Sequence, residues 1–459
     1  MKTIVIMSDT LRRDYLGCYG NPWVKTPVMD EFAKRSVVFD KAYAGSFPTV
    51  PVRADIMLGR HVFPDLGWEA LPAKVPTMAG LLGEAGYTSM MITDTPHMLQ
   101  NGFHYDRGFT AWQWIRGQES DRVRTDYMDE ELLPCSPDKL RQGDRMRRLH
   151  YLNTHFRRNE RDTFVAQTMA AASDWLEGNY KHENFLLYVD TFDPHEPWDA
   201  PEYYLKLYEK EYRGDNVDYP VYDKISRFTR EEVDHCRALY AAEVTLVDTW
   251  LGELLRKVER VGIAEETAII LLSDHGFYFG EHDFIGKFST TEPMPFYEEV
   301  NGLVMMAHVP GAEFRHGERS NALVQPADIL PTVLDLAGVK IPDVVNGRSM
   351  LPMLRRDGSG DNGRQLAVTS AKLIPANAAP AWERGGYTTI TDGTWTLMYG
   401  AAAQKSELYD TSRDPGQTRN LIGSRPAEAE RLHAQYLEFL RSLNVTGELL
   451  AAKQSLPRG

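Results

Sequence analysis

At 459 residues the chain is too long for one ordinary hydrophobic core, and we expect one large α/β domain with a smaller appendage, or two domains. A composition of 42% hydrophobic and 25% charged residues is that of a soluble globular protein. The formal charge of -14 argues against a nucleic-acid partner, because phosphate backbones favour clustered lysine and arginine. A small anionic substrate is not excluded, since a metal ion and one or two basic residues can bind it.

The cysteines and the N-terminal stretch bear on the cellular compartment. Cys18, Cys135 and Cys236 have unrelated spacings and predict neither a disulfide framework nor a zinc knuckle. The first apolar stretch runs only from Ile4 to Met7, which is too short for a signal-peptide core or a membrane span. We therefore expect no membrane contact and a cytoplasmic location.

Four short apolar segments predict buried strands of a parallel sheet. The segments are residues 3–7, 88–92, 185–189 and 268–272, and they run into Asp9, Asp94, Asp190 and the pair Asp274-His275. Because the carboxyl ends of parallel strands meet at one edge of a sheet, where ligands bind, we expect these side chains to converge. A single strand-end aspartate would as readily be a helix cap or a turn residue.

Helical patterns alternate with these strands. Thr26 suits an N-cap and Pro27 a first helical position, and residues 163–177 and 232–261 have apolar residues at helical spacing. The alternation predicts a large mixed, mostly parallel sheet flanked by helices, within a catalytic domain of residues 1–360. Residues 116–160 are dense in arginine and acidic residues, and they predict a solvated insertion such as a lid or an oligomer contact.

The C-terminal part of the chain predicts a second, smaller unit. Residues 355–364 are charged and glycine-rich, as a linker would be. Residues 387–391 and 395–399 predict hairpin strands, and residues 427–443 predict an amphipathic helix. We therefore expect residues 361–459 to form an α+β region built on an antiparallel sheet. This region is a candidate interface for a homo-oligomer.

Asp9, Asp274 and His275 are candidate metal ligands at the predicted sheet edge. Carboxylate mixed with imidazole favours Mn, Zn or Fe over Ca, which prefers oxygen ligands alone. Taken alone, His275 would more readily be a strand-end histidine whose ring bonds only to the chain. The sequence around it is more specific.

The segment Thr49-Val50-Pro51-Val52-Arg53, followed by Ile56-Met57-Leu58-Gly59-Arg60, resembles the sulfatase signature. That signature has a nucleophile, any residue, then Pro-Ser-Arg, and later Leu-x-x-Gly-Arg. Other segments resemble the same family and occur in its order: Ser8 to Gly20, His195-Glu196-Pro197-Trp198, Ser273 to Gly276, Gly280-Glu281-His282, Gly286-Lys287, Asp328 to Thr332 and Glu407 to Asp410. The resemblance covers nearly the whole chain except residues 116–160, and it implies an alkaline phosphatase-like fold.

The resemblance also implies a role for each matching position. Asp9, Asp274 and His275 would bind one divalent metal, and the oxygen of Thr49, the nucleophile, would complete its coordination. Arg53 would favour the alkoxide and hold the substrate anion. His195 and Lys287 would flank the transferred group, contacting its oxygens or protonating the leaving group. The implied activity is hydrolysis of a small anionic ester, with Mn or Zn favoured over Ca.

Thr49 departs from the family, in which the formylglycine route starts from cysteine or serine. The Cβ of threonine carries a methyl group and cannot be oxidised to an aldehyde, so a covalent ester on Thr49 must be released by water. This departure favours phosphate or phosphonate esters, since related phosphodiesterases use threonine in this way. A true sulfatase is the nearest alternative, and a phosphoryl-type transferase that passes the group from Thr49 to an alcohol is a further one.

Two further departures concern the surroundings of the nucleophile. Thr10 stands where many relatives have a second aspartate, so the metal has one anionic ligand fewer. Asp94 and His97 occupy the loop where sulfatases often place a substrate-contacting lysine, and Asp94 favours a monoanionic diester or a positively charged substituent.

We expect Asp94, His97 and His282 to contact substrate. A second metal would need ligands from Asp190, Asp193, His195 and His282, and it is the less favoured arrangement.

Overall fold

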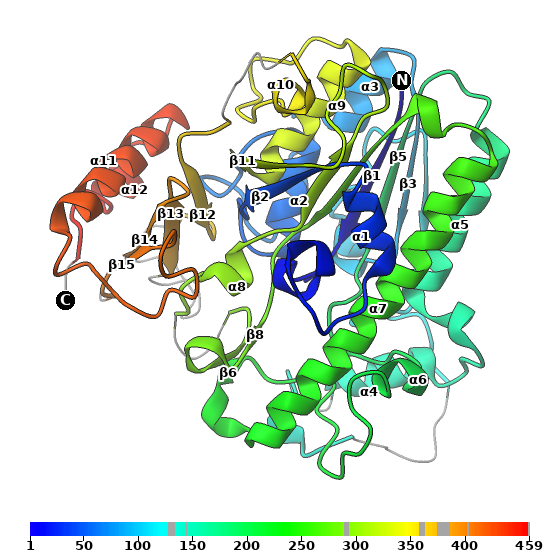
Figure 1. Ribbon diagram of the computed structural model, residues 1–459, viewed down its shortest axis with the longest axis horizontal. Helices are drawn as coiled ribbons and strands as arrows, with labels where there is room; N and C mark the ends of the chain where they lie inside the picture. Colours follow the sequence, from blue (N-terminus) through cyan, green and yellow to red (C-terminus); the bar gives the residue numbers. More distant parts are fainter. Residues whose placement is uncertain are drawn as a thin grey trace.

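The computed structural model describes residues 1–126, 134–143, 145–288, 293–357, 363–373, 386–401 and 404–457 (Figure 1). Its main feature is an eight-stranded sheet in the order β11-β2-β10-β7-β1-β5-β3-β4. β10 is antiparallel to both of its neighbours, and the other neighbouring strands of the sheet run parallel. The strands are β1 Lys2–Ser8, β2 Val37–Ala42, β3 Thr88–Thr93, β4 Ala111–Trp114, β5 Phe185–Thr191, β7 Thr267–Ser273, β10 Met305–His308 and β11 Glu318–Val324. The predicted mixed, mostly parallel sheet is confirmed.

The four strands predicted from the apolar segments are neighbours in the middle of this sheet. In the parallel register, Ser8 of β1 is level with Thr191 of β5 and with Ser273 of β7. Asp9 and Asp274, the next residues of β1 and β7, therefore lie side by side at the carboxyl edge. Asp190 ends up at the same edge, one residue before the end of β5.

Helices cover both faces of the sheet, because the strand side chains alternate between two hydrophobic cores. Ile4 and Ile6 pack in one core, and Val5 and Met7 pack in the other. The first core includes residues from α1 Pro27–Ala33, α5 Phe164–Asn179 and α7 Arg230–Arg260, and the second includes residues from α2 Thr49–Leu58, α3 Met78–Glu84 and α9 Ile329–Ala337. The short helices α6 Glu202–Leu205, α8 Glu298–Asn301 and α10 Leu351–Leu354 lie in the connections.

The predicted helix start at Pro27 is confirmed, but Thr26 does not cap it in the expected way. The Thr26 hydroxyl accepts a hydrogen bond from the Gly17 amide and donates one to Asp30, instead of binding an amide of α1. The helix is instead held by Asp248 of α7, whose carboxylate accepts the amides of Val28 and Met29.

Residues 116–160 are only partly the solvated insertion that their charge predicts. The segment contains α4 Arg145–Thr154, and its inner face is buried through Gln118, Glu119, Asp121 and Asn153. The prediction was wrong there because these polar groups pair with one another and with the sheet edge. The Gln118 amide, for example, donates to Asp193 at 2.6 Å.

A four-stranded antiparallel sheet, β12-β13-β14-β15, forms the core of the C-terminal part and confirms the predicted hairpin. It lies beyond the β11 edge of the large sheet, with α11 on its outer side (Figure 1). The elements are β12 Ala367–Ser370, β13 Tyr387–Thr391, β14 Trp395–Gly400, β15 Glu407–Asp410, α11 Pro426–Ser442 and α12 Gly447–Ala451. A small three-stranded sheet comprises β6 Asp223–Lys224, β8 Tyr278–Phe279 and β9 Phe284–Gly286.

The expected linker at residues 355–364 falls partly outside the described residues, which omit 358–362. Its last residue, Arg364, is buried and makes two hydrogen bonds to Asp328, so that end is anchored. Among the described helices, none is both long enough and apolar enough to cross a membrane.

Candidate active site

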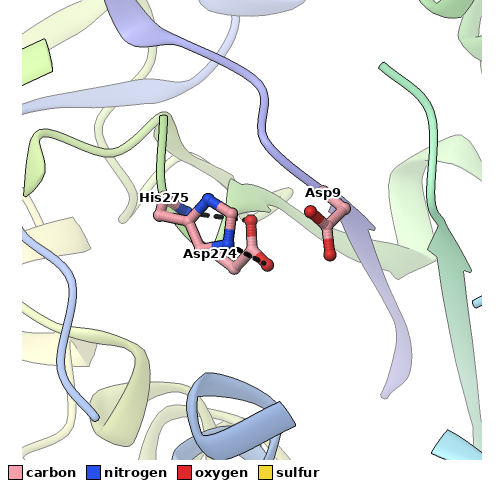
Figure 2. A group of neighbouring side chains, drawn as sticks. All are labelled: Asp9, Asp274 and His275. Carbon is pink, nitrogen blue, oxygen red and sulfur yellow. Dashed lines mark hydrogen bonds and ion pairs between the residues drawn. The ribbon is translucent and has the colours of Figure 1, made fainter. Parts of the chain in front are cut away.

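Asp9, Asp274 and His275 form a buried cluster at the carboxyl edge of the large sheet. One ligand atom from each lies within 4.8 Å of the others, and among the described residues no other group of three acidic, histidine or cysteine side chains meets this criterion. Figure 2 shows the His275 ring and the Asp274 carboxylate side by side beyond β7, with Asp9 facing them from the end of β1. One oxygen of Asp9, Oδ2, is buried and accepts no hydrogen bond, although it lies 3.0 Å from Arg53 Nη1 as an ion-pair partner. The mixed donor set and this oxygen without a hydrogen bond fit a divalent metal ion.

The tautomer of His275 follows from its neighbours. Its Nδ1 lies 3.2 Å from the carbonyl oxygen of Gly276, which can only accept a hydrogen bond, so Nδ1 carries the proton. Burial and the nearby Lys287 lower the pKa of His275 well below its usual value, so the ring is neutral. Nε2 is therefore free to donate its lone pair, as a metal-ligating histidine does.

Thr49 is the first residue of α2 and points its hydroxyl at this cluster. Its Oγ1 lies 3.1 Å from Nε2 of His275, and the side chain is buried. The N-terminus of a helix favours negative charge, so an alkoxide at this position is stabilised by the backbone as well as by any cation nearby.

Arg53, one helical turn after Thr49, lies among carboxylates. Its Nε and Nη2 bind both oxygens of Asp190, at 2.9 and 2.7 Å. Its Nη1 lies 2.9 Å from Asp274 Oδ2 and 3.0 Å from Asp9 Oδ2. Burial opposes the charge, but these three carboxylates raise the pKa of Arg53 well above its usual value. This arrangement differs from the direct contact with substrate that the resemblance implies, because the guanidinium is enclosed by the protein.

Arg53 and the charged side chains around it carry a net charge of one negative unit. Three carboxylates, those of Asp9, Asp190 and Asp274, face two cations, Arg53 and Lys287. All five side chains are at most 2% exposed. A divalent ion would turn the net charge from negative to positive, which suits an anionic substrate.

Thr10 connects Lys287 to Asp9. Its hydroxyl donates to Asp9 Oδ1 at 2.7 Å and accepts from Lys287 Nζ at 3.0 Å, so it is already engaged with the chain. Its backbone has a φ of 60°, which is rare for a β-branched residue. Two hydrogen bonds hold this conformation: the Thr10 amide donates to Asp274, and the Tyr240 hydroxyl donates to the Thr10 carbonyl oxygen.

His195 stacks on Phe192, with ring centroids 3.9 Å apart. Its Nδ1 is 2.6 Å from the carbonyl oxygen of Glu196, so Nδ1 carries the proton and Nε2 is an acceptor. Burial, Lys287 and Arg141 lower the pKa of His195 well below its usual value, and the ring is neutral. Burial likewise lowers the pKa of Lys287, and Asp9 and Glu196 only partly oppose it.

The three predicted substrate contacts lie in different surroundings. Asp94 is buried, and its carboxylate accepts from Thr168, Thr191 and the Phe192 amide, which joins α5 to β5. His97 borders a cavity and pairs with Glu119 at 2.8 Å. His282 stacks on Tyr297 at 3.6 Å and faces Glu299, and no described hydrogen bond, ion pair or ring contact joins it to the cluster.

Sequence reasoning missed several residues that shape the site. Beside His195 lie the buried Glu196 and Tyr222 and the partly buried Arg141. Arg141 Nη1 lies 3.4 Å from Glu196 Oε1 and 3.0 Å from the Tyr222 hydroxyl. Only Glu196 had a signal, its place next to a motif histidine. Arg141 lies in the charged segment 116–160, where no local pattern separates it from the arginines around it.

Two family models and several known proteins match most of the chain. The family model described as "Sulfatase" matches residues 2–339, and the one described as "N-sulphoglucosamine sulphohydrolase, C-terminal" matches residues 280–444. The N-acetylglucosamine-6-O-sulfatase of Bacteroides thetaiotaomicron is 24% identical over 95% of this chain and 85% of that protein. The ulvan-active sulfatase of Formosa agariphila is 25% identical over 92% of this chain and 76% of that protein.

A solved structure shares the whole architecture. The phosphonate monoester hydrolase of Agrobacterium radiobacter superposes with a TM-score of 0.76 at 20% sequence identity, over 97% of this chain and 96% of that chain. The fold is therefore alkaline phosphatase-like, and the site lies at its sheet edge. Because the first family model covers more than half of the residues, the chain belongs to the sulfatase family. Its members are ester hydrolases of the alkaline phosphatase superfamily, and they generally bind a divalent metal.

Proposed function

We propose that the protein is a metal-dependent hydrolase of phosphate or phosphonate esters that works through a covalent ester on Thr49. The observation that carries the proposal is the position of the Thr49 hydroxyl, 3.1 Å from His275 Nε2 and at the N-terminus of α2. A buried hydroxyl beside candidate metal ligands is the arrangement that nucleophilic catalysis requires. Threonine cannot become formylglycine, so the plain hydroxyl is the nucleophile.

Asp9, Asp274 and His275, together with the Thr49 oxygen, would hold one divalent ion. When bound, the ion supplies Lewis acidity that lowers the pKa of the Thr49 hydroxyl and offsets charge on the substrate oxygens. The mixed ligand set favours Mn or Zn over Ca. One ion is favoured over two because Asp190 is held by Arg53, and Asp193 accepts from Gln118 and from the Val165 amide.

In the first step the Thr49 hydroxyl gives its proton to solvent, Oγ1 forms a bond to phosphorus, and the bond to the leaving alcohol breaks. The departing alcohol oxygen takes a proton from Lys287 or from solvent. Lys287, whose pKa is lowered by burial, offers its ammonium to the oxygens of the transferred group or to the leaving oxygen. Arg53 acts as a positioning residue in this step. It binds the Thr49 carbonyl oxygen at 3.1 Å and fixes Asp274 and Asp190 relative to the nucleophile.

In the second step water attacks the phosphorus, the bond between phosphorus and Thr49 Oγ1 breaks, and Oγ1 takes a proton from solvent to restore the hydroxyl. The proton that the water loses passes through His195 to solvent. His195 is suited to accept the proton from that water, because its ring is neutral and its Nε2 has a free lone pair. The two steps together consume one water and release the alcohol and the phosphate or phosphonate.

A true sulfatase is the second candidate, supported by the names of the two curated relatives. The preference for phosphoryl esters is supported by the chemistry of threonine and by the likeness to the phosphonate monoester hydrolase. Both candidates use Thr49, so substrate preference separates them.

The test is a panel of aryl esters offered to the purified, metal-analysed protein: phosphate mono- and diesters, phosphonate monoesters and sulfates. We expect a phosphate or phosphonate ester to be turned over best. A marked preference for aryl sulfates would favour the second candidate. Full activity of Thr49→Ala on every ester would refute the nucleophile assignment. The matched control is Thr249→Ala in α7, whose hydroxyl donates to the Thr245 carbonyl oxygen.

A further inference from the structure

A cavity of about 310 Å³ lies next to the candidate active site, over the described part of the segment 116–160. Its lining includes Trp68, His97, Glu119, Arg122, Arg141 and Arg145. The mechanism proposed above uses none of these residues. Four of them, Glu119 and the three arginines, come from the charged segment, and a fifth, His97, belongs to the loop after β3.

The cavity and the reacting centre share a wall. The Phe192 ring stacks on that of His195, with centroids 3.9 Å apart, and also contacts the His97 ring edge-on, with centroids 5.6 Å apart. Arg141 also joins the two places, because its Nη1 lies 3.4 Å from Glu119 in the cavity and 3.4 Å from Glu196 beside His195. A substrate held by Thr49 and His195 therefore has this cavity beside it.

The charge of the cavity is positive, in contrast to the formal charge of -14 of the whole chain. Three arginines face one carboxylate, that of Glu119, which is already bound by His97, Arg141 and the Tyr219 hydroxyl. Arg122 and Arg145 are exposed, and no hydrogen bond or ion pair joins either of them to another described residue. Free guanidinium groups in a recess are suited to bind a carboxylate, sulfate or phosphate in two-point contact.

Trp68 adds an apolar surface to the same recess. The side chain is 40% exposed, and its ring packs edge-on against His97, with centroids 4.9 Å apart. An exposed tryptophan beside arginines is suited to pack against a ring that carries a charged group.

We propose that this cavity binds the alcohol half of the ester, and that this half carries an anionic group of its own on a ring. The proposal rests on the hydrolase function proposed above and narrows its substrates to esters with a second anion. It replaces the expectation of a positively charged substituent, which depended on Asp94. That carboxylate is enclosed by Thr168, Thr191 and Phe192 and does not line the cavity.

The first experiment measures binding and needs no turnover. By titration calorimetry, 4-hydroxybenzoate and its neutral analogue 4-hydroxybenzamide are offered to the wild type and to Arg122→Gln/Arg145→Gln. We expect the carboxylate to bind about tenfold more tightly than the amide, and the double variant to lose that difference. Arg230→Gln, on the exposed start of α7, is the matched control and should keep it. Equal affinities for the two ligands in the wild type, or an unchanged difference in the double variant, would overturn the proposal.

The second experiment compares turnover of the 4-carboxyphenyl and 4-carbamoylphenyl esters of the same phosphonate. We expect kcat/KM to favour the carboxylated ester in the wild type, and the ratio to approach one in Arg122→Gln/Arg145→Gln. If neither ester is hydrolysed while the carboxylate still binds through the arginines, the hydrolase function fails and the cavity stands. If both are hydrolysed through Thr49 at equal rates in the wild type, the cavity proposal fails and the hydrolase function stands.

Discussion

The carboxyl edge of the large sheet and the described part of residues 116–160, called the covering segment below, use charge in opposite ways. At the edge, Arg53 is completely buried and its donors are bound to Asp190, Asp274, Asp9 and Thr49. In the covering segment, Arg122 and Arg145 are exposed and bind no other described side chain. The enclosed charges fix the geometry of the reacting groups, whereas the free charges are available to a ligand. Under the two proposals made above, one group of residues carries the chemistry and another the substrate specificity.

The largest effect is expected at the nucleophile. Thr49→Ala should reduce kcat/KM for the best ester by about 10³-fold or more, because the covalent route is lost. The measurement is steady-state kinetics at matched metal content. A loss of less than about tenfold would mean that Thr49 is not the nucleophile, and that the sheet edge does not carry the chemistry.

Arg53→Met should destabilise the fold by about 3–5 kcal/mol, since it leaves three buried carboxylates without their shared cation. Denaturant unfolding of the metal-free protein measures this. Arg35→Gln removes a surface pair with Glu259 and is the control, with a loss below about 1 kcal/mol. Equal losses in the two variants would contradict the enclosed network at the edge.

Glu119 should make the attachment of the covering segment dependent on pH. Burial opposes its charge, but His97, Arg141 and Tyr219 outweigh burial and lower the pKa of Glu119 to about 2. The ionised form therefore stabilises the fold above the unfolded pKa near 4.5, by about 3 kcal/mol. This stability is lost as the pH falls toward 2.

The measurement is the difference in unfolding free energy between the wild type and Glu119→Gln, followed from pH 6 downward. The difference should be largest above about pH 4.5 and should shrink as the pH falls. A difference that stays constant over this range would show that the ion pairs of Glu119 do not anchor the segment.

Removal of a bound metal ion should lower the free energy of unfolding by less than the changes at Arg53 and Glu119 do. An ion at one hundred times its dissociation constant stabilises a protein by about 2.7 kcal/mol. We expect chelation to lower the melting temperature and Mn²⁺ or Zn²⁺ to restore it, with no such response in Asp274→Asn. A melting temperature that chelation leaves unchanged in the wild type would argue against the cluster of Asp9, Asp274 and His275 as a metal site.

The sequence predicts the sheet edge better than it predicts the covering segment. Strands such as residues 3–7 and 268–272 are continuous apolar runs, so their burial, their parallel pairing and the convergence of Asp9 and Asp274 could be predicted. The pairing of Arg53 with Asp190 could not, although both residues were singled out, because their positions are 137 residues apart and no local pattern joins them.

The covering segment was the least predictable part of the site. Its burial depends on tertiary contacts such as Gln118 with Asp193 and Glu119 with His97, which its composition does not reveal. A dense run of charge is typical of a solvated surface, and only the fold shows which of its arginines face a cavity. The expectation that Asp94 contacts substrate is weak for a similar reason. Its position after a strand did not show that Thr168 of α5 covers it.

The stereochemical course at phosphorus tests the central proposal most directly. A substrate made chiral at phosphorus with oxygen isotopes is hydrolysed, and the configuration of the product is determined. Transfer to Thr49 and then to water involves two in-line displacements, so we predict overall retention of configuration. Inversion would show a single direct attack by water and would contradict a covalent ester on Thr49.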